Sequence, residues 1–208
     1  MTDLFANAEA AETTLVELDD AAKAAKNDTP KKRKNNPEKL RHQLILAAKD
    51  LMIHDGIANL SIQKVADAAG TSKGGLFHHF KNKEELLSAV IGLFIALLNT
   101  AILLEIEQSG QVSGCFSKAY AKVMFENHEI GLNSEWAGLI RSITGDALMQ
   151  AQWSDWLAQK QRQFAATDSE AHHLLMRYAV DGAWFDPTLA EDGDKFMQVY
   201  QAIMAMAD

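Results

Sequence analysis

Apolar residues recur every three or four positions along most of the chain, a spacing that places them on one face of a helix. The 208 residues include three prolines and twelve glycines. Those numbers are too low for the many turns that a β-sandwich or barrel needs. No stretch shows sustained apolar–polar alternation of the kind a half-buried strand requires. The sequence therefore predicts an all-α fold of long helices joined by short connections.

Cysteine usage and the absence of an export pattern narrow the class of protein. A single cysteine, Cys115, excludes a disulfide framework within the chain and a multi-cysteine zinc site. The N-terminus is acidic and lacks the basic start and apolar run of a signal peptide. The most apolar stretch, 89–104, is broken by Asn99 and is shorter than the roughly 20 residues of a membrane span. We therefore expect a soluble, cytoplasmic protein.

Charge is distributed unevenly along the chain. The net charge of the whole chain is -8. Residues 1–29 carry a net charge of -5, residues 30–90 carry +5, and residues 91–208 carry -8. The basic block of about sixty residues is therefore the part expected to bind a polyanion such as DNA.

The chain divides into three predicted parts. Residues 1–36 form an acidic and then basic extension, 37–85 a DNA-binding domain, and 86–208 a larger helical domain. Within 1–29, apolar residues at helical spacing form a narrow stripe that is mostly alanine. This stripe fits either a docked helix or a frayed extension. Between Pro30 and Pro37, like charges favour an extended arm that is available to DNA; these residues are Lys31, Lys32, Arg33 and Lys34.

Capping residues predict the helices of the basic block. One helix runs from Pro37 to about residue 54, and Gly56 follows it. Ser61, Ser72 and Asn82 are candidate N-caps for helices over 62–69, 73–80 and from residue 83 to about 107. Further helices are expected over 112–128, 134–144, 146–166, 168–185 and 188–207.

Residues 61–80 read as two short helices joined by a tight turn at Gly70. This is the arrangement of a helix-turn-helix, in which the second helix enters the DNA major groove. Small or basic residues open the second helix, and Lys64 and Lys83 add positive charge beside it. The alternative interpretation is a three-helix core that binds no ligand.

Residues 41–90 resemble the N-terminal domain of TetR-type transcriptional regulators over fifty positions without a gap. The matching residues are Ile45, Leu46, Ala48, Leu51, Gly56, Ser61, Ile62, Val65, Ala66, Ala69, Gly70, Ser72, Lys73, Gly74, Leu76, Phe77, His78, Phe80, Lys83, Glu84, Glu85, Leu86 and Leu87. The resemblance implies an all-α homodimer and repression that a small molecule relieves. Together with the charge pattern it predicts DNA-binding roles for Ser61, Lys64, Thr71, Ser72, Lys73, Gly74, Gly75, Phe77, His78, His79 and Lys83.

Four positions depart from the family pattern. Gly75 stands where the family often has Thr or Ser, and Phe77 where Tyr is common. Each lost hydroxyl would cost roughly 1 kcal/mol as a neutral hydrogen bond. His79 replaces a second aromatic residue and Thr71 an aliphatic one. We expect the basic arm to offset these losses through phosphate or minor-groove contacts.

No catalytic or metal-binding pattern is present. The sequence lacks a nucleophile elbow, a P-loop and a dinucleotide fingerprint, so we expect neither an enzyme nor a cofactor. Adjacent helical residues point about 100° apart, so the pairs His78–His79 and His172–His173 are not expected to chelate a metal. We expect His172 and His173 at the surface or at a dimer interface.

The acidic C-terminal part contains large apolar residues at helical spacing that can serve as core or as the lining of a ligand pocket. The pocket candidates are Tyr120, Met124, Trp136, Ile140, Arg141, Met149 and Trp153. By the resemblance, the last two helices pair across a two-fold axis; the alternative is packing within one chain. The interface candidates are His172, Leu175, Met176, Ala179, Ala183, Val199 and Ile203.

The sequence therefore supports two hypotheses about function. The first is a homodimeric repressor that binds a palindromic double-stranded DNA operator and is released by a partly apolar small-molecule effector. The second is a helical ligand- or partner-binding protein with a degenerate helix-turn-helix, favoured by Gly75 and Phe77.

Overall fold

The computed structural model describes residues 36–207, and within this range the regular secondary structure is helical, as predicted. The stripe in 1–29 and the arm Lys31, Lys32, Arg33 and Lys34 lie outside the described residues. In chain order the helices are α2 (Pro37–Asp55), α3 (Ile62–Ala68), α4 (Lys73–Phe77), α5 (Lys83–Ser109), α6 (Cys115–Glu126), α7 (Glu135–Ile143), α8 (Ala147–Gln163), α9 (Ala171–Ala183) and α10 (Gly193–Ala205). Short 3-10 turns at Ile57–Asn59 and Leu189–Glu191 complete them.

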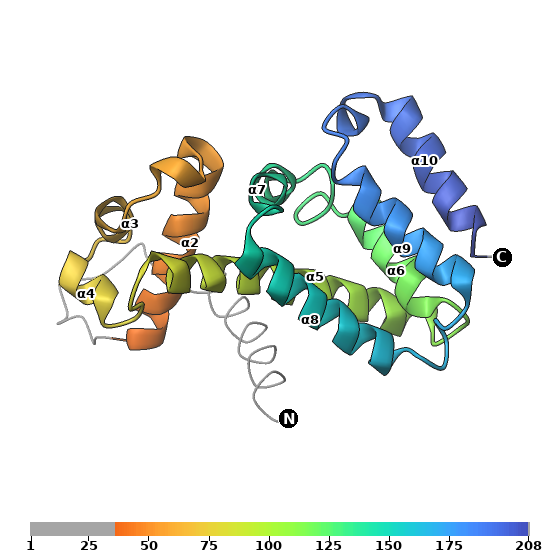
Figure 1. Ribbon diagram of the computed structural model, residues 1–208, viewed down its shortest axis with the longest axis horizontal. Coiled ribbons are helices and arrows are strands. Elements are labelled where there is room, and N and C mark those ends of the chain that lie inside the picture. The colour runs from red at the N-terminus through yellow and green to blue at the C-terminus, as the bar shows by residue number, and fades with distance from the viewer. Residues whose placement is uncertain (1–35, 208) are drawn as a thin grey trace, which may run out of the picture. The chain divides into compact units, whose positions relative to one another are not determined.

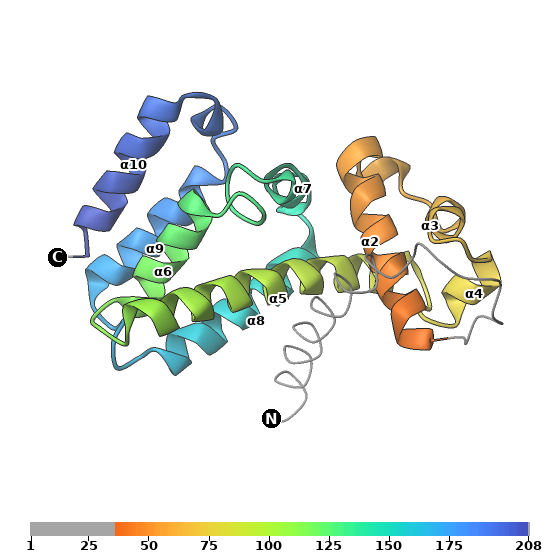
Figure 2. The ribbon, with the colours of Figure 1, turned by 180° about the vertical axis from the view of Figure 1, so that it is seen from behind.

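The helices gather around the long helix α5 (Figure 1). α2, α3 and α4 lie around its N-terminal end, while α6 and α8 pack along the rest of it. α9 packs on α6, and α10 lies against both α6 and α9, as the reverse view also shows (Figure 2). α5 therefore belongs both to the N-terminal helices and to the C-terminal bundle.

The predicted N-caps of the short helices are confirmed. The side chain of Ser61 accepts a hydrogen bond from the Lys64 amide, and that of Ser72 accepts one from the Gly75 amide. Asn82 caps α5 in the same way, through the amide of Glu85 at 2.7 Å. α4 ends at Phe77, three residues before the predicted end, because two of its five residues are glycines that stabilise a helix poorly.

The apolar segment of α5 is longer than the sequence analysis predicted. Its 27 residues include a window of mean hydropathy 2.4, enough by length and composition to cross a membrane. The argument that this region is too short for a membrane span is therefore wrong. In the structure, however, α5 buries side chains from Leu86 to Ile106 against α6 and α8, as the core helix of a bundle does.

A buried carboxylate takes the place of a missing cap at the start of α6. The N-cap position is Gly114, which has no side chain. Asp168, from the segment between α8 and α9, accepts hydrogen bonds from the amides of Phe116 (3.2 Å) and Ser117 (2.8 Å) and from the Ser117 hydroxyl (2.6 Å). Arg177 of α9 donates to the same hydroxyl at 2.8 Å and lies 3.9 Å from Asp168. This network fixes α6 against α9.

Candidate DNA interface and ligand cavity

α3 and α4 form the predicted helix-turn-helix. Gly70 adopts φ +67°, a left-handed conformation that side chains other than glycine rarely take. The Thr71 amide then donates back to the Ala66 carbonyl at 2.9 Å, which closes the turn between the helices. The side chains of Val65, Ala66 and Leu76 are buried and fix α4 against α3.

The residues of α4 divide into a buried side and an outward-facing side. Leu76 and the following Phe80 are fully buried. Lys73, Gly74, Phe77 and His78 are exposed, as is the cap residue Ser72, while Thr71, Gly75 and His79 are half-buried. The ammonium of Lys73 lies 5.9 Å from the centre of the Phe77 ring. The structure thus brings the predicted DNA-contacting residues of this helix together on an accessible surface.

Three predicted DNA contacts lie beside α4 and already have protein partners. The ammonium of Lys64 pairs with Asp55 at 3.1 Å. The half-buried Lys83 donates to the Ile57 carbonyl at 3.4 Å. The Ser61 hydroxyl caps α3, although the residue remains exposed. Substitution of Lys73 is therefore the clearest test of an interaction with DNA.

Gly75 fits its neighbour Thr71. A Cβ atom at position 75 would collide with the Thr71 hydroxyl oxygen in its present rotamer. The two departures from the family pattern are thus coupled: the small residue at 75 leaves room for the hydroxyl at 71. The hydroxyl that the family often has at position 75 is absent in this chain, and Thr71 carries a hydroxyl close to that position.

A cavity of about 200 Å³ lies between α7, α8 and α9. Three predicted pocket residues, Ile140, Met149 and Trp153, line it. Tyr120, Met124 and Trp136 are buried in the bundle, and Arg141 is half-buried, and none of these four is among the lining residues. The remaining lining residues are Thr144, Gln150, Asp181, Trp184 and Phe185.

Asp181 is the charged residue of this lining, and the sequence analysis did not predict it as a pocket residue. Its carboxylate accepts a hydrogen bond from the Tyr120 hydroxyl at 2.5 Å. Burial raises the pKa of Asp181, while the Tyr120 hydrogen bond and the nearby Arg177 act in the opposite direction. Burial, with Asp181 beside it, also raises the pKa of Tyr120. In the sequence, Asp181 follows Arg177 by four residues, a spacing typical of a surface ion pair, and so gave no sign of a cavity.

Both halves of the chain match one protein family. Residues 44–90 match the bacterial regulatory proteins of the tetR family, and residues 114–208 match the tetracyclin repressor-like C-terminal domain. The chain belongs to the TetR family. This is a family of transcriptional regulators and not of enzymes, which confirms the expectation that the chain has no catalytic role.

Individual relatives share the N-terminal region or the fold. The transcriptional repressor KstR2 of Mycolicibacterium smegmatis is 32% identical over 68 residues, which are 33% of this chain and 31% of KstR2. The chain thus aligns with less than a third of the length of the first curated relatives. A TetR regulator of Haloarcula marismortui has a TM-score of 0.68 at 15% identity, covering 82% of this chain and 97% of its own. The multidrug binding protein EbrR, complexed with malachite green, has a TM-score of 0.64 at 16% identity, covering 81% and 98%.

The last two helices of this TetR-family chain expose apolar side chains. Leu175 and Tyr178 of α9 are 57% and 62% exposed, and Phe185 and Met197 are also exposed. Among the predicted interface residues, His172, Ala179 and Val199 are half-buried. Met176, Ala183 and Ile203 are buried in the core of the protomer itself, so their side chains are not available to a partner.

The histidine pair of α9 differs from the expectation for one of its members. His173 is fully buried, not at the surface, and its ring covers Gly114. Its Nε2 atom lies 3.0 Å from Nε2 of His172. Within residues 36–207, no three His, Cys, Asp or Glu side chains come together in a way that could hold a metal ion.

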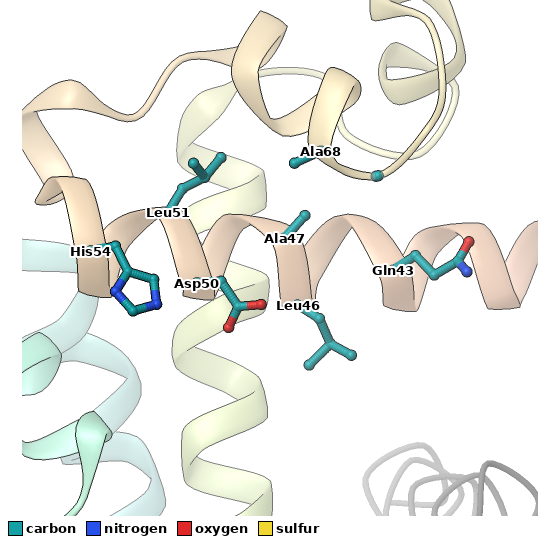
Figure 3. A pocket seen from close by; sticks show the side chains of 8 residues that line it. Gln43, Leu46, Ala47, Asp50, Leu51, His54 and Ala68 are labelled. Atoms are coloured by element: carbon teal, nitrogen blue, oxygen red, sulfur yellow. The ribbon is translucent and has the colours of Figure 1, made fainter. Parts of the chain in front are cut away.

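An open hollow lies between α2 and the end of α3 (Figure 3). Gln43, Asp50 and His54 are its polar lining residues, and Ala68 and Ala69 approach it from the end of α3. The labelled side chains of α2 are spread along that helix, Ala68 lies on α3, and together they do not converge on one point (Figure 3). The hollow therefore lacks the convergent polar groups of a ligand site.

Proposed function

We propose that this TetR-family chain is a homodimeric, cytoplasmic transcriptional repressor that binds a palindromic DNA operator and is released by a small-molecule effector. The observation that carries the proposal is the helix-turn-helix of α3 and α4, which presents Lys73, Phe77 and His78 on one accessible surface. Its position within the family match at 44–90 supports a role in DNA recognition.

The proposal assigns residues 37–85 to DNA and 86–208 to dimerisation and effector binding. The exposed apolar side chains of α9 and α10, with Leu175 and Tyr178 at their centre, support a two-fold interface between protomers. The two copies of α4 would then lie about one DNA turn apart, roughly 34–36 Å, and contact successive half-sites. The cavity between α7, α8 and α9 is the effector site in this proposal. The ligand-bound structure of EbrR, which has the same fold, favours a small molecule there.

α7 offers a route by which the effector changes DNA binding. Ile140 and Thr144, at the end of α7, line the cavity. At the beginning of the same helix, the Trp136 ring lies 5.8 Å from the ammonium of Lys49 on α2. A ligand that displaces α7 would therefore alter the support of the DNA-binding helices. A typical coupling of about 1–3 kcal/mol would change operator affinity 5- to 150-fold.

The direct test is a mobility shift with the DNA that flanks the protein's own gene, in an excess of unrelated DNA. Specific retention is expected for the unmodified protein. Lys73→Ala should weaken operator binding and lower the slope of log affinity against log salt by about 0.9. The matched control is Lys118→Ala on α6, which removes the same charge from the C-terminal bundle and should leave the slope unchanged.

Binding that shows no sequence preference would reject the proposal and favour a ligand-binding protein with a degenerate helix-turn-helix. Equal effects of Lys73→Ala and Lys118→Ala would remove α4 from the DNA interface. Circular dichroism of both variants checks that the fold is retained.

A further inference from the structure

The charged and aromatic groups of the cavity point to a particular class of ligand. Apart from Asp181, its walls consist of apolar and aromatic side chains with two neutral polar groups, Thr144 and Gln150. A volume of about 200 Å³ lies below the roughly 300–1,000 Å³ of pockets for drug-sized molecules. The cavity therefore suits a compact and mainly apolar ligand.

Asp181 has no ion-pair partner within the described residues, although the Arg177 guanidinium lies near enough to lower its pKa. Its carboxylate takes part in no ion pair in residues 36–207, and the hydrogen bond that it accepts there comes from Tyr120. Arg177, one helical turn earlier, directs its guanidinium to Ser117 and Asp168 instead. Burial of an unpaired carboxylate is unfavourable, which is why the pKa of Asp181 is raised. A cation in the cavity would supply the missing counter-charge.

The aromatic walls favour the same ligand chemistry. Trp153, Trp184 and Phe185 line the cavity, and the faces of such rings attract cations. Both indole rings pack against Phe94, whose ring centre lies 6.2 Å from that of Trp153 and 5.9 Å from that of Trp184. The rings are thus positioned before a ligand arrives, which lowers the entropic cost of binding.

We propose that the cavity between α7, α8 and α9 binds a small organic cation, with its charged centre beside the Asp181 carboxylate and its apolar body against Trp153, Trp184 and Phe185. This inference names the class of effector and rests on the proposed function for the role of that ligand. An anion would meet the unpaired carboxylate and be repelled. A neutral ligand that bonds to a protonated Asp181 is the competing outcome that the experiment separates.

The experiment compares two probes of the same shape, phenyltrimethylammonium and tert-butylbenzene. They differ by one positive charge and have the same number of non-hydrogen atoms. Binding is followed by the intrinsic fluorescence of the protein, since Trp153 and Trp184 lie in the cavity wall. We expect the cation to bind at least about tenfold more tightly than the neutral probe at pH 7.5.

Asp181→Asn should abolish this preference and leave the affinity for tert-butylbenzene within about threefold of its original value. The Asn side-chain oxygen can still accept the Tyr120 hydrogen bond. Asp155→Asn is the matched control, because it removes the same charge from an exposed position of α8 outside the cavity. Asp181→Glu should retain the preference for the cation.

A second measurement on the unmodified protein keeps the test valid if Asp181→Asn fails to fold. The cation affinity should fall as the pH is lowered and Asp181 takes up a proton, while the affinity for tert-butylbenzene stays constant. The other titratable or charged groups near Asp181 are Tyr120 of α6 and Arg177 of α9, and the raised pKa of Tyr120 keeps its hydroxyl protonated over this range.

Equal affinity for the two probes, a preference that survives Asp181→Asn, or no binding of phenyltrimethylammonium at about 10 mM would overturn the inference. All of these measurements are made without DNA. Failure here would therefore leave the operator-binding test of the proposed function untouched, and failure of that test would leave this one standing.

Discussion

Removal of the Asp168 carboxylate should strongly destabilise the C-terminal bundle. In Asp168→Ala, the amides of Phe116 and Ser117 lose their acceptor at the start of α6. Arg177, whose side chain is 6% exposed, would then be a buried charge that has lost its ion-pair partner. Because α6 also carries Tyr120, the change reaches the wall of the cavity.

The magnitude follows from these two losses. Loss of a helix cap costs typically about 1 kcal/mol, and removing one partner of a buried ion pair costs about 3–5 kcal/mol. The two terms overlap, so the free energy of unfolding should fall by about 3–5 kcal/mol. For a chain of this length, each kcal/mol lowers Tm by about 2–4 °C, which gives a decrease of about 6–20 °C.

Thermal and urea unfolding at one fixed protein concentration measure the effect, since association of protomers also changes Tm. Asp155→Ala on the exposed side of α8 is the control and should change stability by less than about 0.5 kcal/mol. The double variant Asp168→Ala/Arg177→Met should recover part of the loss, because it removes the unpaired charge and keeps the volume. A loss below about 1 kcal/mol in Asp168→Ala, or no recovery in the double variant, would refute the reasoning.

Three further predictions concern other parts of the C-terminal bundle. Gly114→Ala should lower the free energy of unfolding by about 2 kcal/mol or more in urea melts, because Gly114 has φ +70° and an added Cβ would lie 2.6 Å from the His173 ring. Leu175→Glu should shift the protein from dimer to monomer in light scattering, whereas Ser154→Glu on α8 should not. The raised pKa of Asp181 means that the folded state retains a proton after the unfolded state has lost it, so this residue lowers stability as the pH rises through that window. The stability of Asp181→Asn relative to the unmodified protein should therefore increase with pH between about 4 and the pKa of Asp181 in the folded state.

The helix-turn-helix was predictable because its signals are local. Ser61, Ser72 and Asn82 cap helices through amides three residues away, and Gly70 provides a conformation that its neighbours cannot adopt. Each of these interactions joins residues that are close in the chain, so the order of the residues is enough to predict it. The end of α4 was the exception, since helix propensity near two glycines does not fix a boundary.

The partners of the lysines beside α4 were not predictable. Lys64 bonds to Asp55, nine residues earlier, and Lys83 reaches a carbonyl 26 residues away. Both contacts depend on how α2, α3 and α5 pack. The sequence showed that these lysines belong to a basic block, and the structure showed which of them already have protein partners.

The sequence by itself determined the all-helical class, the helix-turn-helix and the family resemblance, because helical periodicity, capping and a short motif are properties of neighbouring residues. Only the tertiary structure decided that Asp181 faces a cavity and that Asp168 caps a helix more than fifty residues away in the chain. An acidic residue beside a basic one at helical spacing looks like a surface pair in any sequence. Whether it is buried, and which charge it meets, depends on the packing of α6, α8 and α9, which bring together residues that are far apart in the chain.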